Sequence, residues 1–393
     1  ASTTAREAGT PTRLVWCNDG MDSSPNCELI GIKVPSSRCN PCSKEEPMEN
    51  RTVVAVDLAK TVFQIAVSEI PGEVARCRRL NRAGFETFIE KLLPATVVME
   101  ACGSAHYWGR RLQALGHSVQ LLPAHLVRPY VPRNKTDRAD ALGILEAWRN
   151  KDIHPVPVKT VDQQALGGIH RFRSGWIGSR TAQVNTIRGL LREFGILIPM
   201  GVEKVVPQVR LLIEDADSQV PDAIRSSLAA ACDEVELLDR RIKGAEKELE
   251  SLCEQDPVAS LLRSTPGIGL ITGTALVARV GNVDRFRSSR HFASYLGITP
   301  REHSSGLKQR FGRISKRGDA YLRMLLIHGA RSVICHARRV KSHDRLRDWA
   351  LKLQSRTRHN KATVALANKI ARIVWAVWKH GRAYTPGQAI SMA

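Results

Sequence analysis

The sequence predicts an α/β domain, followed by a helical middle region and a mostly helical C-terminal domain. Three observations predict this order. Short apolar runs alternate with amphipathic stretches from residue 52 to 122, apolar residues at heptad spacing mark the region 160–255, and amphipathic helices with glycine-rich turns fill 260–380. A chain of 393 residues is also too long for one ordinary core, so several domains are expected.

Changes in composition and in apolar pattern along the chain predict the domain boundaries. We predict a disordered leader at 1–47, an α/β domain at 48–155, a helical linker at 156–257, a C-terminal domain at 258–385 and a tail at 386–393. The leader is rich in Ser, Pro, Asn and Cys, and Met48 is predicted to be the natural start. Only Cys39 and Cys42 are close together in it, so no zinc site is expected there. The scattered cysteines after residue 50 are typical of reduced thiols in a bacterial cytoplasm.

The α/β domain is expected to hold five strands. The predicted strands cover residues 52–57, 61–68, 74–80, 97–99 and 118–122. Helices are expected at 84–93 and 105–115, where apolar residues recur on one face. Three antiparallel strands followed by alternating helix and strand is the order of an RNase H-like domain.

The helical linker carries an apolar seam with alternating spacings of three and four. Its members are Val235, Leu238, Ile242, Ala245, Leu249 and Leu252. This is a coiled-coil pattern, and either a two-helix hairpin within one chain or a contact between two chains would use it.

The C-terminal domain opens with a glycine-rich turn, Pro266-Gly267-Ile268-Gly269. The turn is typical of a helix-hairpin-helix motif, in which backbone N–H groups and a helix N-terminus bind a DNA phosphate. In that interpretation Gly267 and Gly269 contact nucleic acid. The alternative is a plain turn between two helices.

The charge of the chain indicates its partner. There are 59 Lys and Arg against 38 Asp and Glu, a net charge of +21. An excess of this size predicts a polyanionic partner, and nucleic acid is the expected one. No uninterrupted apolar run is long enough to cross a membrane, and the first residues lack the apolar centre of a secretory signal.

Four carboxylates stand where catalytic acids of such a domain would stand. Asp57 ends the first predicted strand and Glu100 ends the fourth, while Asp137 and Asp140 open a predicted helix, three residues apart on one face. Converging carboxylates repel one another, and a divalent ion with a preference for oxygen ligands relieves that repulsion. The acids therefore predict a Mg²⁺ site, with Mn²⁺ as the alternative, suited to phosphodiester chemistry.

A second constellation lies at 294–323, where serines stand beside glycine among many cations. The nucleic-acid contacts predicted there are Arg301, Lys308, Arg310, Arg313, Lys316 and Arg317. A serine that attacks phosphorus needs cations near the phosphoryl oxygens. The alternative is a loop that contacts the nucleic-acid backbone without chemistry.

These motifs together resemble the insertion-sequence one-ten family of transposases, which is related to the Piv pilin-gene invertase. The resemblance covers about residues 50–382 and rests on Val-Ala-Val-Asp57, Val-Val-Met-Glu100, Asn-Lys-Thr-Asp137-Arg-Ala-Asp140, Thr-Pro-Gly-Ile-Gly and the segment from Tyr295 to Gly318. Members have a RuvC-like domain of the RNase H kind and a C-terminal serine domain.

The resemblance implies a mechanism and partners. It implies that the four acids hold Mg²⁺ and that Ser305, which precedes glycine, attacks a DNA phosphate to form a phosphoserine link. Ser304 is adjacent and stays open as the alternative. It further implies donor and target DNA, a structured guide RNA, and self-association as a dimer or tetramer in which one protomer's acids meet another's serine.

Two rival functions remain open from the sequence. A junction nuclease would use metal-activated water and leave Ser305 structural. A non-catalytic nucleic-acid-binding protein would keep the fold and the charge, although acids that face phosphate would weaken its binding.

Overall fold

The computed structural model describes residues 52–70, 73–74, 76–132, 136–306, 308–337 and 344–386. The predicted leader at 1–47, with its cysteines, lies outside the described residues, as does Lys135 of the Asp137 motif.

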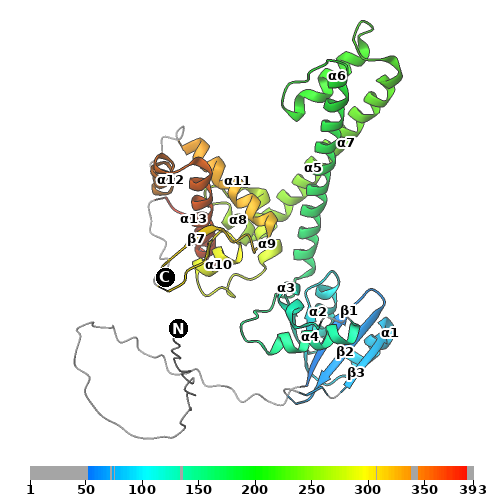
Figure 1. Cartoon of the computed structure of the whole chain (residues 1–393), viewed down its shortest axis with the longest axis vertical. Coiled ribbons are helices and arrows are strands. Elements are labelled where there is room, and N and C mark those ends of the chain that lie inside the picture. Colours follow the sequence, from blue (N-terminus) through cyan, green and yellow to red (C-terminus); the bar gives the residue numbers. More distant parts are fainter. Residues whose placement is uncertain are drawn as a thin grey trace, which may run out of the picture. The chain divides into compact units, whose positions relative to one another are not determined.

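A five-stranded mixed sheet forms the first described region (Figure 1). The strands are β1 (Val53–Leu58), β2 (Val62–Ser68), β3 (Arg76–Asn81), β4 (Thr96–Glu100) and β5 (Ser118–Leu122). Their order is β3-β2-β1-β4-β5; β1 and β2 pair antiparallel, as do β2 and β3, whereas β1 and β4 and also β4 and β5 pair parallel. The five predicted strands are confirmed, with ends that agree within two residues.

Helices cover both faces of this sheet. On one face, α1 (Arg82–Lys91) and α2 (Ala105–Ala114) bury a cluster that contains Phe63 and Trp108, whose ring centroids lie 5.3 Å apart. On the other face lie the short α3 (Ala124–Val127) and η1 (Arg128–Tyr130) and the longer α4 (Asp137–Arg149). The inner strands β1, β2 and β4 are almost wholly apolar, as expected for strands buried on both sides, whereas the edge strand β3 carries three exposed arginines.

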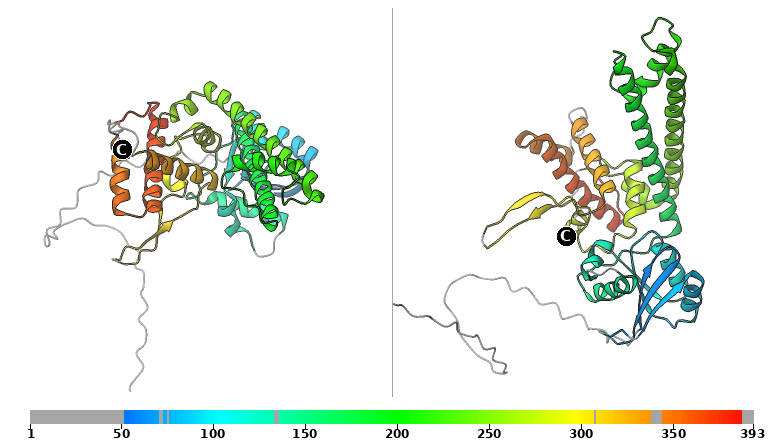
Figure 2. Two further views of the ribbon diagram at one scale, coloured as in Figure 1. Left: turned by 90° about the horizontal axis from the view of Figure 1, so that it is seen from above. Right: turned by 45° about the vertical axis from the view of Figure 1, so that its right-hand side comes forward.

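Two long helices, α5 (Val161–Glu193) and α7 (Asp222–Gln255), run side by side as a hairpin (Figures 1 and 2). The short η2 (Val202–Lys204) and α6 (Val205–Glu214) lie between them in the chain. The predicted apolar seam is thus buried within one chain, and Val235, Leu238, Ile242, Ala245 and Leu249 are buried as expected.

The end of the seam differs from the prediction. Leu252 is 38% exposed and Cys253 is fully buried in its place. The spacing changes from three to four because Leu249 and Cys253 pack into the core of the C-terminal region rather than along the hairpin alone.

The C-terminal region is mostly helical, as predicted. Its helices are α8 (Pro257–Leu262), α9 (Leu270–Val280), α10 (Ser289–Tyr295), α11 (Ala320–Ala337), α12 (Arg345–Arg356) and α13 (His359–His380). A small hairpin of β6 (Pro300–Glu302) and β7 (Phe311–Ile314) projects from them. Within the described part of the chain, no helix has the length and apolar character needed to cross a membrane.

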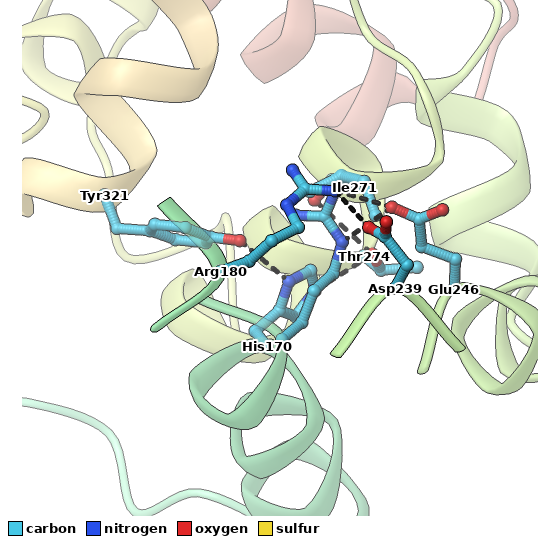
Figure 3. Close-up of polar contacts among 8 residues, drawn as sticks. His170, Arg180, Asp239, Glu246, Ile271, Thr274 and Tyr321 are labelled. Atoms are coloured by element: carbon cyan, nitrogen blue, oxygen red, sulfur yellow. Dashed lines mark hydrogen bonds and ion pairs between the residues drawn. The ribbon is translucent and has the colours of Figure 1, made fainter. Parts of the chain in front are cut away.

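His170 of α5 links the long hairpin to this C-terminal region (Figure 3). Its Nδ1 lies 3.1 Å from the Tyr321 hydroxyl and its Nε2 lies 3.0 Å from the Thr274 hydroxyl. Because the Thr274 hydroxyl already donates to the Leu270 carbonyl at 2.7 Å, we assign the ring proton to Nε2. His170 is 1% exposed, and burial, followed by the charges of Arg279 and Arg173, lowers its pKa from 6.5 to about 4.

This buried imidazole makes stability depend on pH. Between a pH of about 6.5 and about 4 the unfolded chain binds a proton at His170 that the folded chain does not bind, so stability falls as pH falls. The pKa of His106 is also lowered to about 4, chiefly by burial, and adds in the same range. We expect the free energy of unfolding to fall by about 2 kcal/mol between about pH 7.5 and about pH 5 through His170 alone. Urea unfolding of the wild type and of His170→Asn checks this; an equal pH dependence in both would contradict it.

Candidate active site

The sheet brings two of the predicted acids to one edge. In the parallel pairing of β1 with β4, Val56 lies opposite Met99, so that the next residues, Asp57 and Glu100, stand level at the carboxyl ends of neighbouring strands. Both side chains are half-buried. The carboxyl ends of parallel strands are where side chains from separate segments of the chain meet in α/β folds.

The same two acids also share a face of the sheet. Val53 and Ala55 of β1 belong to the apolar cluster on the α4 side, and so does Val98 of β4. Side chains alternate along a strand, so Asp57 and Glu100, two residues further on, lie on that side as well.

Helix α4 carries the other two acids at its start. Asp137 and Asp140 lie in its first turn, and Ala141 and Ile144 anchor the helix to the sheet in the same apolar cluster. The side chain of Thr136 caps the helix by accepting from the Ala139 N–H at 3.2 Å. Neither aspartate therefore serves as the N-cap, and the partial positive charge of the helix start stabilises both.

Asp57 and Glu100 thus share one sheet edge, and Asp137 and Asp140 open the helix that packs on the same face of the sheet. Within the described ranges, no three carboxylate, imidazole or thiol groups lie close enough to hold a metal ion without movement. The donor set nevertheless fits a divalent ion, because carboxylate oxygens are the ligands that such ions prefer and four negative charges gain from a shared cation.

Gln64 is a polar neighbour of this site that the sequence analysis missed. It lies opposite Asp57 in the β1–β2 pairing and is only 8% exposed. Ala66, two residues along β2, packs on the α4 side, so Gln64 faces the same side as Asp57. The signal was present in the sequence, since one polar residue interrupts the apolar strand.

The predicted serine segment forms the β6–β7 hairpin and its connecting loop. Ser305 stands near the tip, where its backbone pairs with that of Lys308 through hydrogen bonds of 3.3 and 3.2 Å. Gly306 has a φ of 58°, a left-handed conformation that glycine adopts without strain. The described residues of this loop are all exposed.

The two adjacent serines differ in their hydrogen bonds. The Ser304 hydroxyl donates to Oε1 of Glu302 at 2.6 Å and accepts from the backbone N–H of Arg310 at 3.2 Å. No hydrogen bond of the Ser305 hydroxyl occurs among the described residues. Ser304 therefore closes the base of the loop, and Ser305 is presented beyond it.

The predicted cations around the hairpin are all exposed. They are Arg301, Lys308, Arg310, Arg313, Lys316 and Arg317. Arg301 donates to the Ser315 carbonyl at 3.2 Å and so braces the end of β7. Lys316 adopts a left-handed φ of 55°.

The two glycines of the predicted DNA-binding turn have different surroundings. Gly267 has a φ of 84° and lies against Gly329 of α11. A Cβ added at Gly329 would come within 2.0 Å of the Gly267 carbonyl oxygen. Close packing therefore accounts for Gly267. An added Cβ at Gly269 would meet nothing within 4 Å, and this residue precedes α9 without a side-chain cap.

This difference predicts the effects of two substitutions. Gly329→Ala should destabilise the fold by about 1–3 kcal/mol, although alanine favours a helix, because the backbone of Gly267 would have to move. Gly269→Ala is the control without a close contact and should cost less, about 0.5–1 kcal/mol, because alanine is a poorer N-cap than glycine. Thermal unfolding of both variants measures this. Equal stabilities of the two variants would show that Gly329 does not pack against Gly267 as closely as described.

Two family models match the chain across these features. One describes a DEDD transposase domain and matches residues 54–196; the other describes the transposase IS116/IS110/IS902 family and matches residues 259–345. The chain belongs to this transposase family. It is therefore an enzyme that cuts DNA strands and transfers them, and its α/β domain has the RNase H-like fold that the sequence predicted.

Named relatives agree along nearly the whole chain. A protein of Pseudomonas aeruginosa called "Probable family 20 transposase" is 41% identical over 340 residues, which are 86% of this chain and all of that protein. The transposase for insertion sequence element IS1111A of Coxiella burnetii is 36% identical and covers 88% of this chain and 94% of its own length. The transposase for element IS1328 of Yersinia enterocolitica is 34% identical, over 86% of this chain and all of its own.

The matched regions of the transposase contain every predicted catalytic residue. Asp57, Glu100, Asp137 and Asp140 fall in the DEDD region, and Ser305 falls in the second region. Domains of the DEDD kind typically use a divalent metal ion, in keeping with the oxygen-rich donor set at the sheet edge.

Proposed function

We propose that this transposase cleaves and rejoins DNA with Ser305 as the nucleophile, assisted by a metal centre formed by Asp57, Glu100, Asp137 and Asp140. The observation that carries the proposal is that Asp57 and Glu100 share one edge of the sheet and the face on which α4 packs. Four carboxylates that converge from β1, β4 and α4 would repel one another, and a shared cation would relieve that repulsion.

We propose Mg²⁺ as the ion, with Mn²⁺ as a substitute. All four donors are hard oxygen ligands, which suit both ions, and both act on phosphates in other proteins. When bound, the ion supplies positive charge that stabilises the phosphoryl oxygens as the phosphate reacts. Asp137 and Asp140 hold their place through the packing of α4, and Asp57 and Glu100 hold theirs through the sheet.

Ser305 rather than Ser304 is the proposed nucleophile. The Ser304 hydroxyl has one donor and one acceptor contact already, so it would have to give up the Glu302 carboxylate to attack. The exposed Ser305 stands next to Gly306, which lets a phosphate approach the loop.

In the proposed step, Oγ of Ser305 forms a bond to phosphorus and loses its proton. The bond from phosphorus to one deoxyribose oxygen breaks, and that oxygen leaves with the electron pair and takes up a proton. The exposed cations of the hairpin, above all Arg310, Arg313 and Lys308, neutralise the phosphoryl oxygens. Lys316, Arg317 and the N–H groups after Gly269 are proposed to hold the DNA backbone.

We also propose a structured guide RNA and a second protomer as partners. The net charge of +21 exceeds what a single phosphate contact requires, and the family resemblance implies both partners. Binding of the transcript from the element's noncoding end, measured by gel shift against an unrelated RNA of equal length, tests the RNA. Mass measurement in solution tests self-association.

The decisive experiment for the mechanism detects the covalent link. The full chain is incubated with element-end DNA, the noncoding RNA and Mg²⁺, and the products are separated under denaturing conditions. A protein–DNA adduct that maps to Ser305 supports the proposal. Free 3′-hydroxyl and 5′-phosphate ends without an adduct would instead indicate a nuclease that uses water.

A further inference from the structure

A stacked aromatic pair, an exposed Phe172 and a half-buried Trp176, lies on α5. The rings of Phe172 and Trp176 stack with centroids 5.8 Å apart and planes inclined by 23°. Phe172 is 66% exposed although its side chain is large and apolar. Neither residue takes part in the apolar clusters of the described chain. The exposed ring of Phe172 offers an apolar π face on which a planar ligand can stack.

The helix surface around the pair is open. Gly168 and Gly175 lie within one turn of Phe172 on the same side of α5, and an added Cβ at either would meet nothing within 4 Å. Ser179, one turn beyond Gly175, is exposed and small. A ligand that stacks on Phe172 therefore meets backbone and small side chains on one flank, and can approach closely.

The charge of α5 has one sign over most of its length. From residue 163 to 192 the helix contains five arginines and no acidic residue. Two of these arginines are neutralised by α7, since Arg173 pairs with Glu246 and Arg180 with Asp239, at 2.6 and 2.5 Å. Arg171, beside Phe172, is exposed and has no ion pair among the described residues. Burial is the largest cause that lowers the pKa of Lys159, and the charge of Arg171 contributes to it, so Arg171 and Lys159 lie near one another at the start of α5.

We propose that unpaired bases of a single DNA strand stack on Phe172 and Trp176, with the flanking phosphates beside Arg171. Every base offers a π face to such a platform, whatever its sequence. A second copy of α5 is disfavoured as the occupant because two helices with the same positive charge repel one another. DNA is preferred to RNA because DNA is the substrate of the family. The inference does not depend on the serine mechanism.

The test measures the affinity of the full chain for a labelled oligothymidine, a DNA duplex and an oligouridine, over a range of salt concentrations. Phe172→Leu keeps the apolar character but removes the ring, and should weaken oligothymidine binding about tenfold, with the salt dependence unchanged. Phe172→Tyr should restore the affinity. Arg171→Gln should weaken binding and reduce the slope against log salt by about 0.7, the loss of one phosphate contact.

Leu211→Ala is the matched control, because Leu211 is similarly exposed, at 67%, on α6. It should bind oligothymidine as the wild type does. The proposal is overturned if Phe172→Leu binds oligothymidine normally, or if it loses duplex binding to the same extent. It is also overturned if only oligouridine binding falls, which would assign the platform to RNA, or if Phe172→Leu changes the molecular mass in solution, which would assign it to a second copy.

Discussion

Substitution of Ser305 by alanine is expected to abolish the covalent protein–DNA adduct and to slow strand cleavage by about a thousandfold or more. The Cβ of alanine has no oxygen to attack phosphorus, and no neighbouring hydroxyl is placed as Ser305 is. The fold should be unaffected, because Ser305 is exposed at the hairpin tip and pairs with Lys308 only through the backbone. A denaturing gel with end-labelled DNA measures the adduct.

Ser304→Ala is the control that separates the two serines. It removes the hydroxyl that joins Glu302 to the Arg310 N–H, a hydrogen-bonded brace worth about 1 kcal/mol at an exposed position. The adduct should still form, at a rate reduced by at most about tenfold. An adduct that survives Ser305→Ala and disappears in Ser304→Ala would show that Ser304 is the nucleophile, with Glu302 as its base.

The strands of the α/β domain could be predicted from the sequence because most of them are short apolar runs. Alternating apolar and polar segments predicted all five strands, and the burial of β1, β2 and β4 on both sides follows from their composition. The heptad seam predicted a hairpin or a dimer contact equally well. The choice depended on α5, whose arginines pair with Glu246 and Asp239 of α7, and such long-range pairing cannot be read from one helix.

Part of the candidate active site could also be predicted from the pattern of the strands. Asp57 and Glu100 stood out because each ends an apolar strand, and strand alternation then decides the face on which they lie. Gln64 was missed because its importance comes from its place opposite Asp57, which is set by the register of β2. The contact of Gly267 with Gly329 joins the turn before α9 to the distant helix α11, and only the tertiary packing reveals that it needs glycine.

Asp57→Asn should reduce strand cleavage by at least about a hundredfold, since a metal ion at a phosphate contributes several kcal/mol and the substitution removes one of four ligand charges. Asparagine keeps the size of the side chain and one oxygen, so the packing beside Gln64 and α4 is preserved. Cleavage of end-labelled DNA at saturating Mg²⁺ measures the loss, and excess Mn²⁺, which binds nitrogen and oxygen ligands more tightly, should restore part of it.

A second measurement separates metal binding from catalysis. Mg²⁺ that binds the folded chain raises its unfolding temperature, and this rise should be smaller in Asp57→Asn than in the wild type. Asp152→Asn makes the same charge change at an exposed position after α4 and should alter neither the rise nor the cleavage. If Asp57→Asn and Asp152→Asn respond to Mg²⁺ alike, Asp57 is not a ligand, and its position level with Glu100 serves the packing of the sheet edge instead.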